Sequence, residues 1–298
     1  MKTQTPFTRV FPIVALFLLL SFWPSAQGAT PPTGNPEPDA ISPSLLDTGF
    51  DELYKLDFSG AREKFLSYQK LQPADPLGKA AEAASYLYQE FNDKGIFTST
   101  FFLDDTKFLG GIDGKPSENR NDAFLQSNED AREMATDLLK SNPRDAHGLL
   151  VLTMADGMES DYDALIEKKQ LAGLSMMRRA ESEATTLLSI DPSANDAYLA
   201  LGASNYVIGS LPAYKRFFLK IGGVHGDKNR GIEQMRQAAE NGHYLKPFAK
   251  ILLALGYERE HQLNQARVLL ADLTNQFPEN PLFAHELSLI QKDPSGEQ

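Results

Sequence analysis

The sequence predicts an all-α protein, a solenoid of helix pairs with irregular insertions. Apolar residues recur at helical spacing over nearly the whole chain from about Leu45 onward, and alternating β-branched residues are scarce. Four segments also share one pattern of small and apolar residues, each closed by a proline at the same offset. The chain has 298 residues, 42% of them hydrophobic, which is enough to bury a sizeable core in one large or two small units.

The first 28 residues have the composition of a signal peptide. Lys2 and Arg9 are their only charges, and the apolar run over 10–22 is too short to span a membrane comfortably. Small residues stand at the −3 and −1 positions of a cut after Gly28. We therefore predict that residues 1–28 are removed from an exported protein, either periplasmic or secreted. An uncleaved anchor helix is the alternative interpretation, and a lipoprotein is excluded because the chain has no cysteine.

A proline-rich stretch follows the predicted cut. Residues 29–44 hold five prolines in sixteen positions, a density that disfavours both helices and packed strands. This composition predicts a disordered leader, most simply a spacer. The folded domain is then expected to run over 45–291, with a frayed tail over 292–298.

The four aligned segments predict a repeated helix that stops at proline. Each segment is aligned on one alanine, here called its anchor: Ala61, Ala131, Ala180 and Ala266. Four residues after the anchor (offset 4) stand Phe65, Ala135, Ala184 and Leu270, and seven residues after it (offset 7) stand Tyr68, Leu138, Leu187 and Leu273. Twelve residues after it (offset 12) stand Pro73, Pro143, Pro192 and Pro278. Offsets 0, 4 and 7 form one helical stripe, and proline ends the helix. Asp75, Asp145, Asn195 and Asn280 follow the prolines and are expected to cap the next helix.

The next helix carries its own signature. Tyr198, Leu201 and Gly202 follow Pro192, and a comparable Leu253, Ala254 and Tyr257 precede the last anchor. With these positions the chain resembles the tetratricopeptide repeat (TPR) family over most of 45–291, as a divergent exported member of bacterial type. The resemblance implies antiparallel helix pairs with small residues where helices cross, so Ala180 and Gly202 are predicted to be critical for packing.

The repeats are irregular, which predicts insertions. The anchors are spaced by 70, 49 and 86 residues, whereas multiples of 34 are expected for this family. Insertions are expected at 96–121, at 156–173 and at 207–231. Insertions of this length suggest a closed, irregular solenoid rather than a smooth superhelix.

No catalytic, cofactor-binding or metal-binding motif is found in the sequence. The five histidines lack metal-site spacing, and the adjacent acids have no nucleophile motif near them. The glycine-rich run 222–231 lacks the order of a phosphate-binding loop and is interpreted as a turn with Asp227 or Asn229 capping a helix. A formal net charge of −11 argues against binding to nucleic acid.

The favoured function is an interaction scaffold in the cell envelope. Its partner is predicted to be another protein, which offers a peptide or an amphipathic helix to the concave face. That face is predicted to include His147, Met154, Leu199, Ala203, Tyr206, Phe248, Ile251, Leu255 and Glu258. The alternative is an enzyme or small-ligand binder whose pocket is closed by the insertions at 96–121 and 207–231. The sequence leaves the partner's identity and the oligomeric state open.

Two aromatic stretches lie in these insertions. The segment PAYKRFFLK (212–220) is expected to pack its aromatic residues across the groove, and contact with a membrane or a partner is the less favoured alternative. Its filling of the groove is nearly as plausible as occupancy by a partner. The segment FTSTFF (97–102) is expected to seal an edge of the solenoid.

Overall fold

A computed structural model describes residues 38–112, 114–221 and 223–292, and over these residues the protein is helical without a strand. In chain order the helices are α1 (Pro38–Tyr54), α2 (Phe58–Leu71), α3 (Pro76–Asp93), α4 (Ser99–Phe102), α5 (Asp105–Gly110), α6 (Glu118–Ser141), α7 (Ala146–Asp161), the π-helix η1 (Tyr162–Ile166), α8 (Gln170–Ile190), α9 (Ala197–Ser210), α10 (Ala213–Ile221), α11 (Lys228–Asn241), α12 (Lys246–Arg259), α13 (Leu263–Gln276) and α14 (Pro281–Lys292). The predicted signal peptide and most of the predicted leader and tail lie outside the described residues. Helix α1 begins at Pro38, within the predicted leader; proline is well tolerated at a first helical position.

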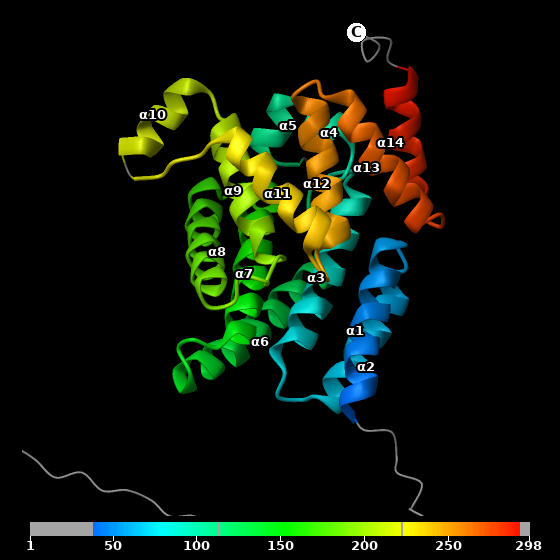
Figure 1. The fold of residues 1–298 in the computed structure, drawn as a ribbon, viewed down its shortest axis with the longest axis vertical. Coiled ribbons are helices and arrows are strands. Elements are labelled where there is room, and N and C mark those ends of the chain that lie inside the picture. Colours follow the sequence, from blue (N-terminus) through cyan, green and yellow to red (C-terminus); the bar gives the residue numbers. More distant parts are fainter. Residues whose placement is uncertain (1–37, 113, 222, 293–298) are drawn as a thin grey trace, which may run out of the picture. The chain divides into compact units, whose positions relative to one another are not determined.

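The helices form a solenoid of pairs, as predicted. Eleven of the described helices pack in series, each against the next: α1, α2, α3, α6, α7, α8, α9, α11, α12, α13 and α14 (Figure 1). Successive pairs are α1–α2, α3–α6, α7–α8, α9–α11 and α12–α13, followed by α14. The remaining elements α4, α5, η1 and α10 belong to the three insertions.

The proline stops join one pair to the next, as the repeat pattern predicted. Helices α2, α6, α8 and α13 each end just before the residue that precedes a template proline. The four anchor alanines are buried, at 0–2% exposure. Asp75 and Asp145 accept hydrogen bonds from the backbone N–H groups of Leu77 and Gly148 at 2.8 Å, which confirms two of the predicted caps. Asn280 likewise accepts from the N–H of Leu282 at 3.0 Å.

The fourth predicted cap is wrong, because Asp196 and not Asn195 precedes α9. The Asn195 side chain instead donates to the carbonyl of Ser193 at 2.9 Å. The carboxylate of Asp196 reaches across to the start of α12, where it accepts from the N–H groups of His243, Tyr244 and Leu245 at 2.7, 3.0 and 3.3 Å. Asp196 therefore satisfies backbone donors of the turn that leads into α12, a contact distant in sequence that local spacing cannot reveal.

The solenoid closes on itself, as the irregular spacing suggested. The Tyr54 hydroxyl of α1 donates to the carbonyl of Tyr244 at 2.8 Å, and the Asn280 amide donates to the carbonyl of Tyr54 at 2.8 Å. The rings of Phe50 and Tyr244 lie 4.9 Å apart, and Tyr54 also contacts Phe277. One hydrophobic cluster thus joins the first helices to α12–α14.

Helices α9 and α11 cross at short range, which explains the glycines at 202 and 231. A Cβ on Gly202 would lie 2.6 Å from the backbone nitrogen of Met235 and 2.9 Å from the carbonyl of Gly231. A Cβ on Gly231 would lie 2.5 Å from the backbone nitrogen of Tyr206. Asp227 caps α11 by accepting from the N–H of Arg230 at 2.9 Å, so the glycine-rich run is a capped turn, as predicted.

Replacing Gly202 with alanine should lower the free energy of unfolding by about 1–3 kcal/mol, because the backbone of α11 must move away. Urea denaturation provides the measurement. The matched control is Gly157→Ala in α7, where a Cβ would meet nothing within 4 Å. This substitution should stabilise the helix by about 0.5–1 kcal/mol. An equal response of the two variants would contradict the assigned crossing.

A candidate ligand-binding pocket at the insertion edge

All three insertions lie at the same edge of the solenoid. Each one joins the first helix of a pair to the second: α3 to α6, α7 to α8 and α9 to α11. Because the helices alternate in direction, these connections emerge at one edge, and the proline turns occupy the other. In Figure 1, α4, α5 and α10 accordingly lie at the end of the molecule where α12 turns into α13.

A cavity of about 560 Å³, here called the edge pocket, opens between the insertions. Its walls come from α3–α5, from α7, η1 and α8, and from α9, α10, α11 and α12. The lining side chains are mostly aromatic or aliphatic: Phe91, Ile96, Phe97, Phe101, Phe102, Phe108, Leu165, Leu171, Leu174, Met177, Ala203, Tyr206, Val207, Ile208, Leu211, Tyr214, Phe218, Leu219, Met235, Phe248 and Leu252. A smaller hollow of about 100 Å³ shares residues with it and extends toward Met154 and Leu199.

The first insertion builds the inner wall of the edge pocket. Phe97 packs against Tyr88 and Phe91 of α3 and Phe248 of α12, with ring centroids 5.1, 5.7 and 6.0 Å apart. Phe97 and Phe101 are both 5% exposed, so these two aromatic residues of the 97–102 segment are buried. This segment, and not the 212–220 segment, occupies the concave side of the solenoid.

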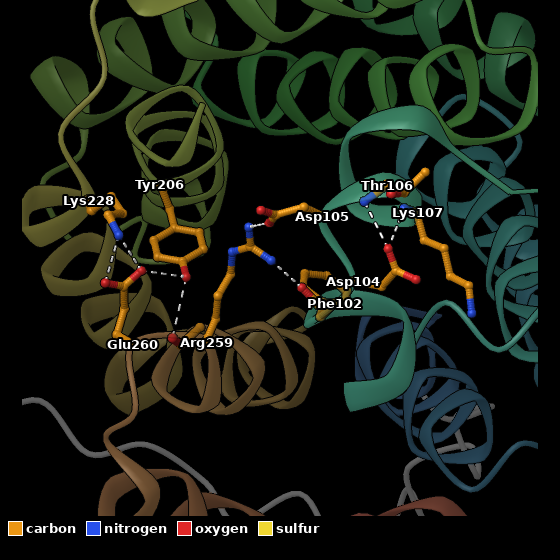
Figure 2. Close-up of polar contacts among 10 residues, drawn as sticks. Phe102, Asp104, Asp105, Thr106, Lys107, Tyr206, Lys228, Arg259 and Glu260 are labelled. Carbon is orange, nitrogen blue, oxygen red and sulfur yellow. Dashed lines mark hydrogen bonds and ion pairs between the residues drawn. The ribbon is translucent and has the colours of Figure 1, made fainter. Parts of the chain in front are cut away.

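The end of α12 binds both large insertions (Figure 2). The Arg259 guanidinium donates to the carbonyl of Phe102 at 2.5 Å and pairs with Asp105. The Glu260 carboxylate accepts from the Lys228 ammonium at 2.6 Å and from the Tyr206 hydroxyl at 3.1 Å. Adjacent residues of one helix end therefore fix the first and third insertions relative to each other.

Asp161 is the acidic side chain of the edge pocket. It stands at the junction of α7 with η1 and lines both the main cavity and its smaller extension. Its carboxyl group has no hydrogen-bond or ion-pair partner among the described residues. Burial raises the pKa of Asp161 to about 7, because the apolar walls penalise the charged form.

Two other acids near the pocket, Asp156 and Asp196, are buried and have partners. Asp156 of α7 lies 3.2 Å from the Nε of Arg132 and 2.9 Å from that of Arg179. Asp196 holds the three backbone N–H groups described above, and Ser160 donates to the carbonyl of Gly173 at 2.9 Å. Asp161 is only partly buried, and it differs from these two acids in having no hydrogen-bond or ion-pair partner among the described residues.

A second hollow of about 530 Å³ lies beside the contacts of Arg259 and Glu260. It is lined by charged groups, including Asp105, Lys228 and Glu260, that pair as just described. Glu258 also lines it, and burial together with the nearby Glu286 raises the pKa of Glu258 to about 7. Because its other charges hold the insertions in place, this hollow is a weaker candidate than the edge pocket.

Helix α10 borders the mouth of the edge pocket without filling the cavity. None of its residues is buried, and Phe217 and Phe218 are 62% and 69% exposed. The prediction that the 212–220 segment packs its aromatic residues across the groove is therefore wrong. The first insertion already occupies that space, which leaves α10 at the rim.

The predicted partner-binding residues do not form one open groove. Met154, Leu199, Ala203, Tyr206 and Phe248 line the edge pocket or its extension. The other members lie elsewhere: Ile251 and Leu255 in the hydrophobic core, Glu258 in the charged hollow, and His147 beside Asp75 at 2.6 Å. The pairing with Asp75 raises the pKa of His147.

Sequence reasoning missed Asp161, although a signal was present. The predicted concave stripe of α7 holds His147 and Met154, and Asp161 continues it at seven residues beyond Met154. A carboxylate on an otherwise apolar stripe is unusual. Among the described residues, no cluster of His, Asp or Glu suited to a metal ion occurs, and no helix is long and apolar enough to cross a membrane.

Comparison with known proteins leaves the function open. No protein-family model matches the chain, and no curated protein does. Among solved structures, the chain is similar to the crystal structure of a thermophilic TPR protein from Thermus thermophilus, with a TM-score of 0.45 and 17% sequence identity. The match covers 84% of this chain and 98% of the other. A similarity this distant carries no functional argument, so the function must be argued from the site itself.

The raised pKa of Asp161 predicts a pH-dependent effect of Asp161→Asn. As pH rises from about 4 to 7, the unfolded chain releases this proton while the folded protein retains it, so the wild type loses stability. The stability of Asp161→Asn relative to wild type should therefore increase by about 1–3 kcal/mol over this range and level off above pH 7. Urea denaturation at several pH values measures this; a difference independent of pH would contradict the uncompensated carboxyl.

Proposed function

We propose that this protein is a non-catalytic binding protein that encloses an apolar ligand in the edge pocket. The observation that supports this most directly is a cavity of about 560 Å³ with an almost wholly apolar lining. Binding sites for small molecules commonly have volumes of roughly 300–1,000 Å³ and few polar groups. Of the two functions that the sequence suggested, the geometry favours the ligand binder with a pocket closed by insertions.

The concave face gives less support to capture of an amphipathic helix. Six of the residues predicted to meet such a partner are buried, at 3–6% exposure: Met154, Leu199, Tyr206, Ile251, Leu255 and Glu258. The first insertion covers much of this face from within the chain. A partner protein remains the second candidate because Leu171, at the mouth, is 83% exposed and could meet an apolar side chain of that partner.

The chemistry of the edge pocket also restricts the ligand. A purely apolar ligand would leave the Asp161 carboxyl desolvated and unpaired, which is unfavourable for its charged form. A ligand with an amine beside its apolar part would supply the missing charge and hydrogen bond. We therefore propose an amphiphile with a cationic or hydrogen-bond-donating group as the preferred ligand.

Catalysis is not part of the proposal. The polar groups facing the edge pocket from the described residues are few, and Ser160 already donates to a carbonyl. This set does not supply a nucleophile with an adjacent base. Export to the periplasm or beyond remains a proposal that rests on residues 1–28, and N-terminal sequencing of the protein from the cell envelope would test it.

Filling the edge pocket should weaken the binding of an apolar probe. Ala203 lines both parts of the cavity, so Ala203→Phe should weaken binding of the fluorophore N-phenyl-1-naphthylamine by about tenfold or more. The control Ala284→Phe, at an exposed position of α14, should bind as wild type does. Equal binding by both variants, or no binding by the wild type, would contradict the proposed function.

The ligand chemistry has its own test. A primary alkylamine should displace the probe at lower concentration than an alcohol of the same chain length. Asp161→Asn should remove most of this preference, because an amide cannot form the charge pair. The displacement curves of the two ligands would coincide for the wild-type protein if Asp161 did not face the ligand.

A further inference from the structure

Helix α10 projects from the solenoid with an uncovered apolar face. Tyr214, Phe217, Phe218 and Ile221 are 62–71% exposed, the highest exposures of any described large apolar residues apart from Leu171 and Val268. Figure 1 shows α10 standing away from the series of packed helices. An apolar surface kept in water on a nine-residue helix is costly and points to an interaction.

These four side chains share one face of the helix. Their positions are i, i+3, i+4 and i+7, the spacing of a single helical stripe. The opposite side faces the domain: Arg216 donates to the carbonyl of Gly209 at 3.1 Å, and Leu219 is partly buried at the edge pocket. Helix α10 is therefore held through Arg216 and Leu219, while its apolar stripe stays exposed, at the pocket mouth at Tyr214 and Phe218 and away from the pocket lining at Phe217 and Ile221.

Basic residues accompany this apolar face. Lys215 and Lys220 are exposed on either side of the stripe, and Arg216 lies on the side of α10 that faces the domain. No acidic residue occurs between Asp196 and Asp227, although the chain as a whole carries a formal charge of −11. This segment is thus a local positive region on an acidic protein, and its charge complements an anionic surface.

We propose that α10 docks this protein on an anionic lipid bilayer. The four apolar side chains enter the region between headgroups and acyl chains, and the flanking lysines reach the lipid phosphates. Aromatic and aliphatic residues on one face with lysines beside it are the features of a helix that lies in a membrane interface. The acidic remainder of the domain is repelled by the same surface, which leaves α10 as the point of contact.

Docking would also orient the edge pocket. Tyr214, Lys215 and Phe218 line the pocket mouth as well as belonging to α10. A bilayer bound to α10 would therefore lie beside the mouth, and an amphiphile could pass between membrane and cavity. This last step rests on the proposed function, whereas the docking surface itself does not.

The test uses the chain from Ala29 onward, so that the apolar run over 10–22 cannot itself bind lipid. Co-sedimentation is measured with phosphatidylcholine vesicles, with and without phosphatidylglycerol. The wild type should bind the vesicles that contain phosphatidylglycerol, and added salt should weaken this binding. Phe217→Ser/Phe218→Ser should abolish binding, and Lys215→Gln/Lys220→Gln should weaken it by about fivefold per lysine.

Control variants replace an exposed apolar side chain or two exposed lysines elsewhere on the protein. Val268→Ser on α13 and Lys70→Gln/Lys292→Gln on α2 and α14 should bind vesicles as wild type does. All variants should keep the melting temperature of the wild type, since the altered side chains are exposed. The proposal would be overturned if the wild type did not bind anionic vesicles, or if the α10 variants bound them as well as the wild type does. It would also be overturned if the protein bound no lipid and the α10 variants instead lost binding to a partner protein.

The two proposals can fail separately. Phe217→Ser/Ile221→Ser changes two stripe residues that do not line the pocket, so it should abolish vesicle binding and still bind the apolar fluorophore. Ala203→Phe should still bind vesicles. Loss of vesicle binding by Ala203→Phe would show that the pocket, not α10, holds the lipid. Absence of fluorophore binding by a protein that does bind anionic vesicles would remove the proposed function and leave the docking surface intact.

Discussion

The packing of Phe97 between α3 and α12 is the contact on which the site depends. The concave surface of a helix-pair solenoid is normally open, and here the rings of Tyr88, Phe91 and Phe248 would form part of its floor. Phe97 covers these rings and brings the first insertion onto the inner face, where Arg259 then holds its backbone. Burial of this aromatic cluster turns an open groove into a walled pocket with an open mouth, because the insertion becomes a wall instead of a surface loop.

The position of the insertions in the repeat explains why they form one site. An insertion between the two helices of a pair emerges at the edge opposite the proline turns, and three successive pairs carry one there. The close crossing at Gly202 and Gly231 draws α11 against α9, which keeps the third insertion near the other two. Local helix contacts and repeat order thus determine a long-range arrangement, and the α12 end locks it through Arg259 and Glu260.

Much of the solenoid was predictable from the sequence, because its determinants are local. A proline removes a backbone donor and an aspartate after it caps the next helix, and both effects act within a few residues, as at Pro73 and Asp75. The site was less predictable, because its determinants are distant in sequence. Asp196 reaches residues 243–245, and the aromatic residues of the first insertion displace α10 from the groove. Either of the two aromatic insertions could have packed on the concave surface, and helical periodicity does not predict which of them does.

Two features of the edge pocket lower stability without helping the fold. The Asp161 carboxyl is desolvated with no partner among the described residues, and α10 keeps four large apolar side chains in water. On these grounds, a protein with asparagine or leucine in place of Asp161, or with serines on α10, would be at least as stable. Natural sequences depart from such local rules chiefly where function requires it. Both departures meet at the same cavity, one inside it and one at its mouth, and this coincidence is the strongest physical reason to place the function of the protein there and not along the concave face of the solenoid.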